Sequence, residues 1–182
     1  SMVYLDVTRL LTWEGNYTGM ERFAYEISRA LLSDQDKFRL CCFVPSKGFV
    51  ELGDTVTFKD GRLVSSVMQP GSSLRTLLKT NKKQFMAQYA RRRLLRRQQM
   101  QLPLISATKN DTLLVYDGLW DRDNYIQVLE GLAQSGIRLA HVVHDMVPLV
   151  MPHVCFEYVT EAFKKYFDRI APQIDMLFSI SK

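Results

Sequence analysis

The sequence of 182 residues has few cysteines and no long apolar run. Cys41 and Cys42 are neighbours in a segment whose alternate side chains would face opposite sides of a sheet, and Cys155 stands alone. Three such cysteines predict no disulfide framework and fit a reducing compartment. No window approaches the ~20 consecutive apolar residues of a membrane-spanning helix, and the first residues lack the basic stretch of a signal peptide. We therefore expect a cytoplasmic protein.

Acidic residues are absent from positions 61–110, although this stretch holds eleven of the 24 Lys and Arg residues. The rest of the chain then has thirteen basic and 19 acidic residues, a net charge of −6 against +5 for the whole. The basic character therefore belongs to one segment. For residues 72–100 we predict a basic helical insertion that packs on the domain through Leu74, Leu78, Phe85 and Tyr89. Beyond Tyr89 it would project, carrying Arg91, Arg92, Arg93, Arg96 and Arg97.

The remaining chain alternates between strand-like and helix-like segments. Short, continuous apolar stretches predict strands at residues 3–7, 38–44, 112–116, 138–143 and 175–178. Apolar residues at helical spacing predict helices at 20–32, 121–134 and 156–170, and a small hairpin is expected at 55–58 and 62–67. This alternation predicts a mainly parallel sheet covered on both faces. We expect one three-layer α/β/α, Rossmann-like domain over residues 1–182.

Two short segments are candidates for a binding or catalytic site. Thr18 and Gly19 stand at the start of a predicted helix, where free N–H groups and the helix dipole can hold an anion. His144 and Asp145 follow the strand at 138–143, and Pro148 with Pro152 should keep the next residues from entering a helix at once. Each segment also has a plainer interpretation. Thr18 and Gly19 would then be an ordinary helix cap with a turn glycine, and His144 and Asp145 would only cap a turn.

The known phosphate-binding motifs rich in glycine are absent. The sequence contains neither G-x-G-x-x-G nor G-x-x-x-x-G-K-[ST], so neither a nicotinamide-dependent dehydrogenase nor a P-loop enzyme is supported. His153 has no spacing to other side chains that suggests a metal site, and we expect neither metal nor cofactor.

The segments DVTRL, YTGMERFAYEISRAL, VVHDMVPLVMP and IDMLFSISK follow one another in a recognisable order. In this order they resemble the N-terminal domain of GT-B glycosyltransferases, and most closely the retaining family-4 enzymes that build bacterial polysaccharides, many of them mannosyl- or rhamnosyltransferases. Residues 44–112 contribute nothing to the resemblance. The matching residues are Asp6, Thr18, Gly19, Arg22, His144, Asp145, Pro148, Pro152, Asp175, Ser179 and Ser181.

The resemblance implies an acceptor-side domain that works with a second, donor-binding domain and is inactive alone. It implies that Gly19 and nearby amides approach the diphosphate of a nucleotide-sugar, with Thr18 and Arg22 in the same motif. His144 would face the donor sugar, and Asp145 would orient His144 or face the acceptor, a glycan or a lipid-linked sugar. Asp117 and Trp120 follow the strand at 112–116 and should lie at the same crevice. Trp120 and Trp13 are candidates for stacking on a sugar, although large aromatic residues are also common in a hydrophobic core.

The basic segment leaves two partner classes open. An anionic inner surface of the bacterial membrane suits an enzyme with a lipid-linked acceptor. Nucleic acid competes, but the segment has no known motif for reading bases and few interleaved aromatics, so no specific nucleic-acid partner is expected. The alternative function is a non-catalytic α/β module that engages nucleic acid or a protein through Arg91 to Arg97.

Overall fold

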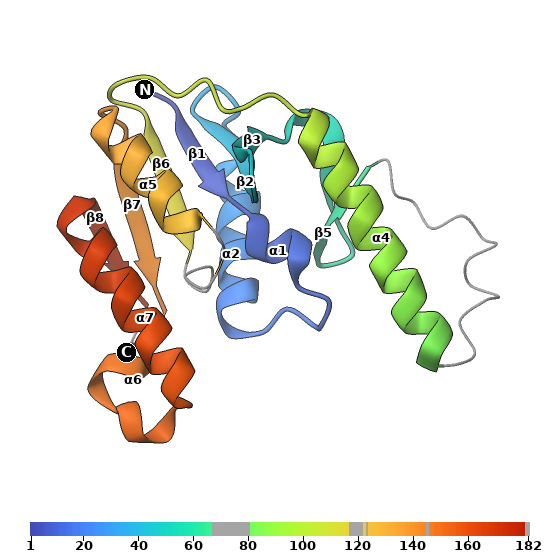
Figure 1. The fold of residues 1–182 in the computed structure, drawn as a ribbon. Coiled ribbons are helices and arrows are strands. Elements are labelled where there is room, and N and C mark those ends of the chain that lie inside the picture. Colours follow the sequence, from blue (N-terminus) through green and yellow to red (C-terminus); the bar gives the residue numbers. More distant parts are fainter. Residues whose placement is uncertain (67–80, 117–121, 123, 145, 181–182) are drawn as a thin grey trace.

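The computed structural model describes residues 1–66, 81–116, 122, 124–144 and 146–180, apart from the side chains of 81–84. Its main sheet has six strands in the order β3-β2-β1-β6-β7-β8. Neighbouring strands are parallel except β2 and β3. The predicted α/β fold with a mainly parallel sheet is confirmed (Figure 1). The strands are β1 Val3–Asp6, β2 Phe38–Val44, β3 Gly48–Glu51, β6 Thr112–Tyr116, β7 Arg138–Val143 and β8 Ile174–Ser179.

The helices connect these strands and mostly follow the apolar periodicity of the sequence. Short 3₁₀ turns stand at Gly53–Thr55, Pro152–Val154 and Ala171–Gln173. The α-helices are α1 Thr8–Thr12, α2 Gly19–Leu31, α4 Asn81–Gln101, α5 Tyr125–Gln134, α6 Val147–Val150 and α7 Glu157–Ile170.

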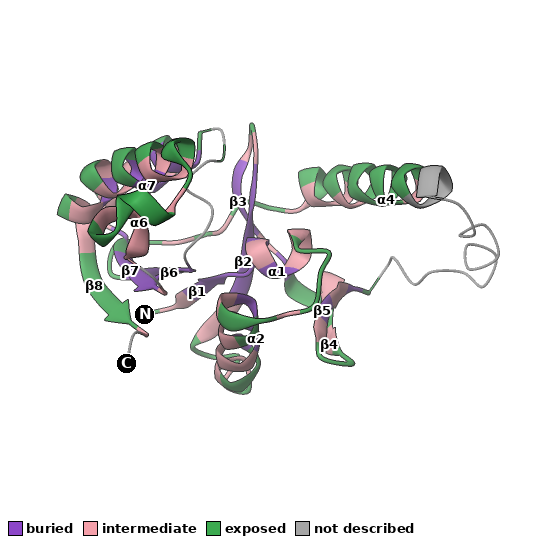
Figure 2. Cartoon of the chain, turned by 90° about the horizontal axis from the view of Figure 1, so that it is seen from below, coloured by how far each residue is buried: buried purple, intermediate pink, exposed green. Residues whose placement is uncertain are grey.

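Two apolar clusters lie on opposite faces of the sheet. On one face Cys42 packs in a cluster with Tyr25 of α2, and on the other Cys41 packs with Tyr125 of α5 and Tyr166 of α7. Figures 1 and 2 show α2 on one side of the strands and α7 on the other. The two cysteines are free, and burial raises the pKa of both thiols, so they remain protonated near neutrality. They behave as strand residues, as predicted.

The predicted hairpin is confirmed as β4 Val56–Lys59 paired with β5 Arg62–Ser65. Its two turn residues, Asp60 and Gly61, have φ of 51° and 73°. Positive φ at both positions gives the turn a twist that matches the strands it joins.

The expectation that Pro148 and Pro152 delay helix formation is wrong. Helix α6 begins at Val147 with Pro148 in its first turn, and the 3₁₀ turn Pro152–Val154 begins with Pro152 itself. A proline in the first turn costs no hydrogen bond, because the N–H groups of that turn have no partner within the helix anyway.

The packing expected for Phe85 and Tyr89 in the basic helix is also wrong, and Leu74 and Leu78 lie outside the described residues. Phe85 and Tyr89 are 68% and 59% exposed, and the N-terminal half of α4 extends away from the sheet (Figures 1 and 2). The C-terminal end of α4 makes the contacts instead, since Lys47 Nζ donates to the Met100 carbonyl oxygen at 2.6 Å and Ser65 Oγ to Gln98 Oε1 at 3.2 Å.

The reason lies in the residues that follow α4. The amide of Glu51 donates to the Pro103 carbonyl oxygen at 2.9 Å. The amide of Ile105 donates to the Phe49 carbonyl oxygen at 3.0 Å. The chain beyond α4 thus runs beside β3 and anchors that end of the helix. Within the described residues, no helix, α4 included, has the length and apolarity needed to cross a bilayer.

Candidate functional site

The strand order reverses between β1 and β6, which makes their carboxyl ends the first place to look for a binding site. From β1 the chain moves to β2 on one side, and it later continues with β6 on the other side of β1. In open α/β sheets, ligands bind where the order reverses in this way. Asp6 and Tyr116 end these two strands, and Val143 ends β7 next to them.

Gly19 and His144 lie against each other at this edge. A methyl group added to Gly19 would sit 3.6 Å from His144 Nε2. Gly19 has φ of 51°, in the left-handed region that favours glycine. The two residues expected to face the donor therefore come from the start of α2 and the end of β7 into one place.

The imidazole of His144 has unused hydrogen-bonding capacity. The residue is half-buried, and its Nδ1 atom is buried without a hydrogen-bond partner among the described residues. Buried polar atoms are nearly always paired, so an unpaired ring nitrogen is unusual. A neutral imidazole donates with one nitrogen and accepts with the other, which suits contact with a sugar hydroxyl or a phosphate oxygen.

His141 has no such capacity. It is buried, with Nε2 2.6 Å from the Tyr166 hydroxyl and Nδ1 3.1 Å from the Val142 carbonyl oxygen. Burial lowers its pKa to about 4, so the ring is neutral near pH 7. The expectation that His141 is structural agrees with these contacts.

The N-terminus of α2 is open to a ligand. Thr18, which is exposed, precedes the helix in extended conformation, and its side chain caps no amide. Glu21 in the first turn is buried and paired with Arg9 at 3.0 Å, so its charge is neutralised. The free amides at the helix start can therefore attract an anion.

Arg22 is directed along α2. Its guanidinium pairs with Glu26 at 3.0 Å, one turn further on, and 60% of its side chain is exposed. This surface ion pair is weak, and Arg22 can exchange Glu26 for another anion.

Asp6 matches the family pattern but is structural. Its buried carboxylate accepts hydrogen bonds from the Thr8 amide at 3.0 Å, the Thr8 hydroxyl at 2.5 Å and the Tyr125 hydroxyl at 2.9 Å. Burial raises the pKa of the carboxyl group, while these bonds oppose the rise. Asp6 thus joins the end of β1 to α1 and α5.

Three predicted site residues, Asp117, Trp120 and Asp145, lie outside the described residues. Trp13, the other candidate for sugar stacking, is 36% exposed. Its Nε1 donates to the Asn16 carbonyl oxygen at 3.1 Å, and the Arg9 guanidinium lies 4.4 Å from the ring centroid.

The arginines of α4 divide between two hollows. Arg91, Arg92 and Arg96 line a cavity of about 580 Å³ that also receives Arg62 of β5 and Arg122. Sequence reasoning missed Arg62 and Arg122, because both lie outside the predicted basic helix at 72–100 and only the fold brings them to it.

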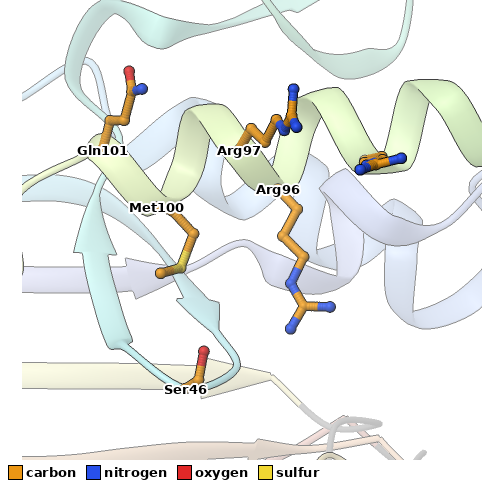
Figure 3. Close-up of a pocket in the computed structure, with 6 residues that line it drawn as sticks. Ser46, Arg96, Arg97, Met100 and Gln101 are labelled. Atoms are coloured by element: carbon orange, nitrogen blue, oxygen red, sulfur yellow. The ribbon is translucent and has the colours of Figure 1, made fainter.

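A second hollow lies between α4 and the β2–β3 turn (Figure 3). Its arginines are Arg93, Arg96 and Arg97, opposite Ser46. Figure 3 shows Arg96 and Met100 pointing toward Ser46, whereas Arg97 points to the other side of the helix. Arg96 lines both hollows.

Two separate features therefore stand out at the carboxyl edge of the sheet. One is the contact between Gly19 and His144 beside an open helix start, and the other is the cavity lined by arginines under α4. Comparisons with protein-family models, curated proteins and solved structures found no match to this chain.

Proposed function

We propose that this chain is the acceptor-side domain of a retaining GT-B glycosyltransferase that moves a hexose from a nucleotide-sugar to a glycan or lipid-linked acceptor. The observation that carries the proposal is the position of His144 Nε2, 3.6 Å from where a side chain on Gly19 would begin. The resemblance assigned both residues to the donor site from segments far apart in the sequence, and they lie together.

The fold supports the same proposal. Helix α2 packs on one face of the sheet, and α5 and α7 pack on the other. We interpret this arrangement as a three-layer, Rossmann-like domain in which α4 is an inserted basic helix. Two such domains facing a cleft make up a GT-B enzyme, and the second domain would carry most donor contacts.

Each residue then has a defined part in the transfer. The amides at the start of α2 would hold the leaving diphosphate, with Thr18 and Arg22 beside them. The His144 imidazole would donate to the donor sugar near the reacting carbon, and Asp145 would orient it or meet the acceptor. In a retaining transfer the leaving phosphate guides the incoming hydroxyl on the same face, so this domain needs no nucleophile of its own.

Helix α4 suggests where the enzyme works. Its arginines are exposed, and its outer half adds the exposed apolar side chains of Phe85, Met86 and Tyr89. Cations combined with apolar groups favour the surface of an anionic membrane. We therefore place the enzyme in the cytoplasm, peripherally on the inner face of the bacterial membrane.

Sugar transfer and donor binding test the proposal together. A polypeptide that joins this chain to its donor domain should transfer labelled sugar from a GDP- or UDP-sugar into a lipid or glycan fraction. Calorimetry on residues 1–182 alone should show nucleotide-sugar binding weaker than micromolar. Micromolar binding that Arg96→Gln does not weaken would assign the donor to this domain, and a two-domain polypeptide without transfer activity would exclude the function.

The second candidate is a non-catalytic module that uses α4 to engage nucleic acid or a protein. It is favoured by Arg91, Arg93 and Arg97, which are exposed and have no acidic partner among the described residues. Binding of the chain to short duplexes tighter than to anionic vesicles would support it over the enzyme.

A further inference from the structure

The cavity under α4 lies apart from the contact between Gly19 and His144. Its walls come from α1, the ends of β2 and β5, and one side of α4. Leu10, Leu63 and Leu95 give it apolar surface, and Thr12 and Gln99 add neutral hydrogen-bonding groups. Its charged residues are Glu14, Arg62, Arg91, Arg92, Arg96 and Arg122.

Positive charge dominates this cavity. Five arginines line it, and Glu14 is the one acidic residue among the described residues of its wall. Glu14 pairs with Arg92 at 2.8 Å, whereas Arg91 and Arg96 have no acidic partner in the described part of the chain. Several guanidinium groups around one cavity repel one another, and an anion between them relieves that repulsion.

Arg62 is held in position for such an anion. Its Nη1 donates to the Gly15 carbonyl oxygen at 2.6 Å, and its Nη2 donates to that of Trp13 at 2.5 Å. The guanidinium also lies 4.6 Å from the centroid of the Tyr17 ring. These partners fix its geometry while leaving its charge unneutralised, which reduces the entropy lost when a ligand binds.

The size and lining define the class of ligand. A volume of about 580 Å³ falls within the range of about 300–1,000 Å³ typical of small-molecule sites, well above what one inorganic phosphate fills. Guanidinium forks match the oxygens of a phosphate group in pairs. We propose that this cavity binds an organic phosphate with at least two negative charges, its uncharged part lying against the leucines.

Glu14 acts as an internal competitor. Its carboxylate neutralises Arg92, and a bound phosphate would take the place of that carboxylate. This site does not depend on the role proposed for His144, since no residue is shared between them.

Calorimetry with inorganic pyrophosphate as the probe tests the site. Arg96→Gln should weaken binding about tenfold or more, the scale of one charge-assisted hydrogen bond. Arg97→Gln is the matched control, because it removes the same charge from the same helix but Arg97 does not line this cavity. Glu14→Gln should tighten binding. All three side chains are exposed, so the variants should fold, and thermal unfolding verifies this.

Vesicles distinguish a soluble phosphate from a lipid headgroup. The same variants are sedimented with phosphatidylcholine vesicles whose only anionic lipid is phosphatidic acid. An Arg96-specific loss with pyrophosphate assigns the site to a soluble phosphate, and the same loss only with vesicles assigns it to a headgroup. If neither probe shows a loss specific to Arg96→Gln, or if neither probe binds, the proposal is overturned.

Discussion

At the residue scale, the folded state keeps His141 neutral. Burial sets its pKa at about 4, whereas in the unfolded chain it returns to the ordinary value of 6.5. Between these values the unfolded state binds more protons than the folded state, so stability falls as the pH drops from about 6.5 toward about 4. The loss is about 2 kcal/mol by about pH 5.

We predict that His141→Gln removes this part of the pH dependence. Glutamine can still bond the Tyr166 hydroxyl but does not titrate. The unfolding free energy of the variant should therefore fall less between about pH 7 and pH 5 than that of the native chain. Urea unfolding at both pH values measures the change in unfolding free energy for each protein. Subtracting the two changes cancels the contribution of titrating groups that both proteins share. Parallel pH profiles would show that His141 does not titrate on unfolding.

The substitution Gly19→Ala should affect stability through the backbone and activity through the site. Gly19→Ala should lower the unfolding free energy by about 1–2 kcal/mol, because alanine is strained in the left-handed region. The new methyl would stand 3.6 Å from His144 Nε2, an ordinary contact without a clash. It would still fill the space where a donor approaches, so transfer activity in the two-domain enzyme should fall as well.

Gly53→Ala is the control for this strain. Gly53 has φ of 50° and open space around it, so its substitution carries the same backbone cost far from His144. Thermal unfolding should show similar losses for both variants, with transfer reduced only in Gly19→Ala. Equal activity in the two variants would remove Gly19 from the site.

At the scale of elements, continuous apolar segments were the best guide. The predicted strands 38–44, 112–116 and 138–143 coincide with β2, β6 and β7. These strands are buried over most of their length, so most of their positions are apolar.

Helix α1 shows why other elements could not be predicted. Its five residues are too few for a periodic pattern, and long-range contacts hold it in place. The amide of Phe43 donates to the Thr8 hydroxyl at 2.7 Å, and the Tyr125 hydroxyl donates to the Asp6 carboxylate, just before the helix, at 2.9 Å. Such contacts leave no local signal in the sequence.

Helix α4 is predicted to bind anionic membranes in a salt-dependent manner. Each basic residue near such a surface adds about 1 kcal/mol, so losing five should weaken vesicle binding tenfold or more. Added salt should weaken it too, because screening limits these charges to about 8 Å at physiological ionic strength. Sedimentation with anionic vesicles compares the native chain with a variant carrying Gln at Arg91, Arg92, Arg93, Arg96 and Arg97.

The control removes as many exposed cations elsewhere on the molecule. It carries Gln at Arg29, Lys37, Arg138, Lys164 and Lys165, all of them exposed. This control should pellet with vesicles nearly as well as the native chain. Equal pelleting of all three proteins would exclude α4 as the membrane contact.

At the scale of the whole molecule, the alternation of strands and helices was enough to predict a mainly parallel sheet. The antiparallel edge strand β3 was not predicted, because Gly48–Glu51 is short and is held by pairing with β2 and with residues 103–105. The position of α4 escaped prediction for the same reason, since residues beyond it determine which end is anchored. The resemblance implied one donor site for Gly19 and His144, whereas nothing in the sequence predicted the cavity lined by arginines.

The role of His144 is tested most directly by turnover and thermal unfolding of one preparation of the two-domain enzyme. His144→Ala should lower the rate of sugar transfer about 10²-fold or more, the usual loss when a positioned catalytic contact is removed. The fold should persist, because this half-buried side chain follows the last residue of β7 and belongs to neither apolar cluster. His153→Ala is the matched control, since His153 is exposed in a neighbouring turn and should tolerate the change.

The measurement has two clear outcomes. A slow but fully folded His144→Ala enzyme, beside an unaffected His153→Ala enzyme, is the predicted result. A lower melting temperature with normal turnover per folded molecule would make His144 structural and contradict the proposed site.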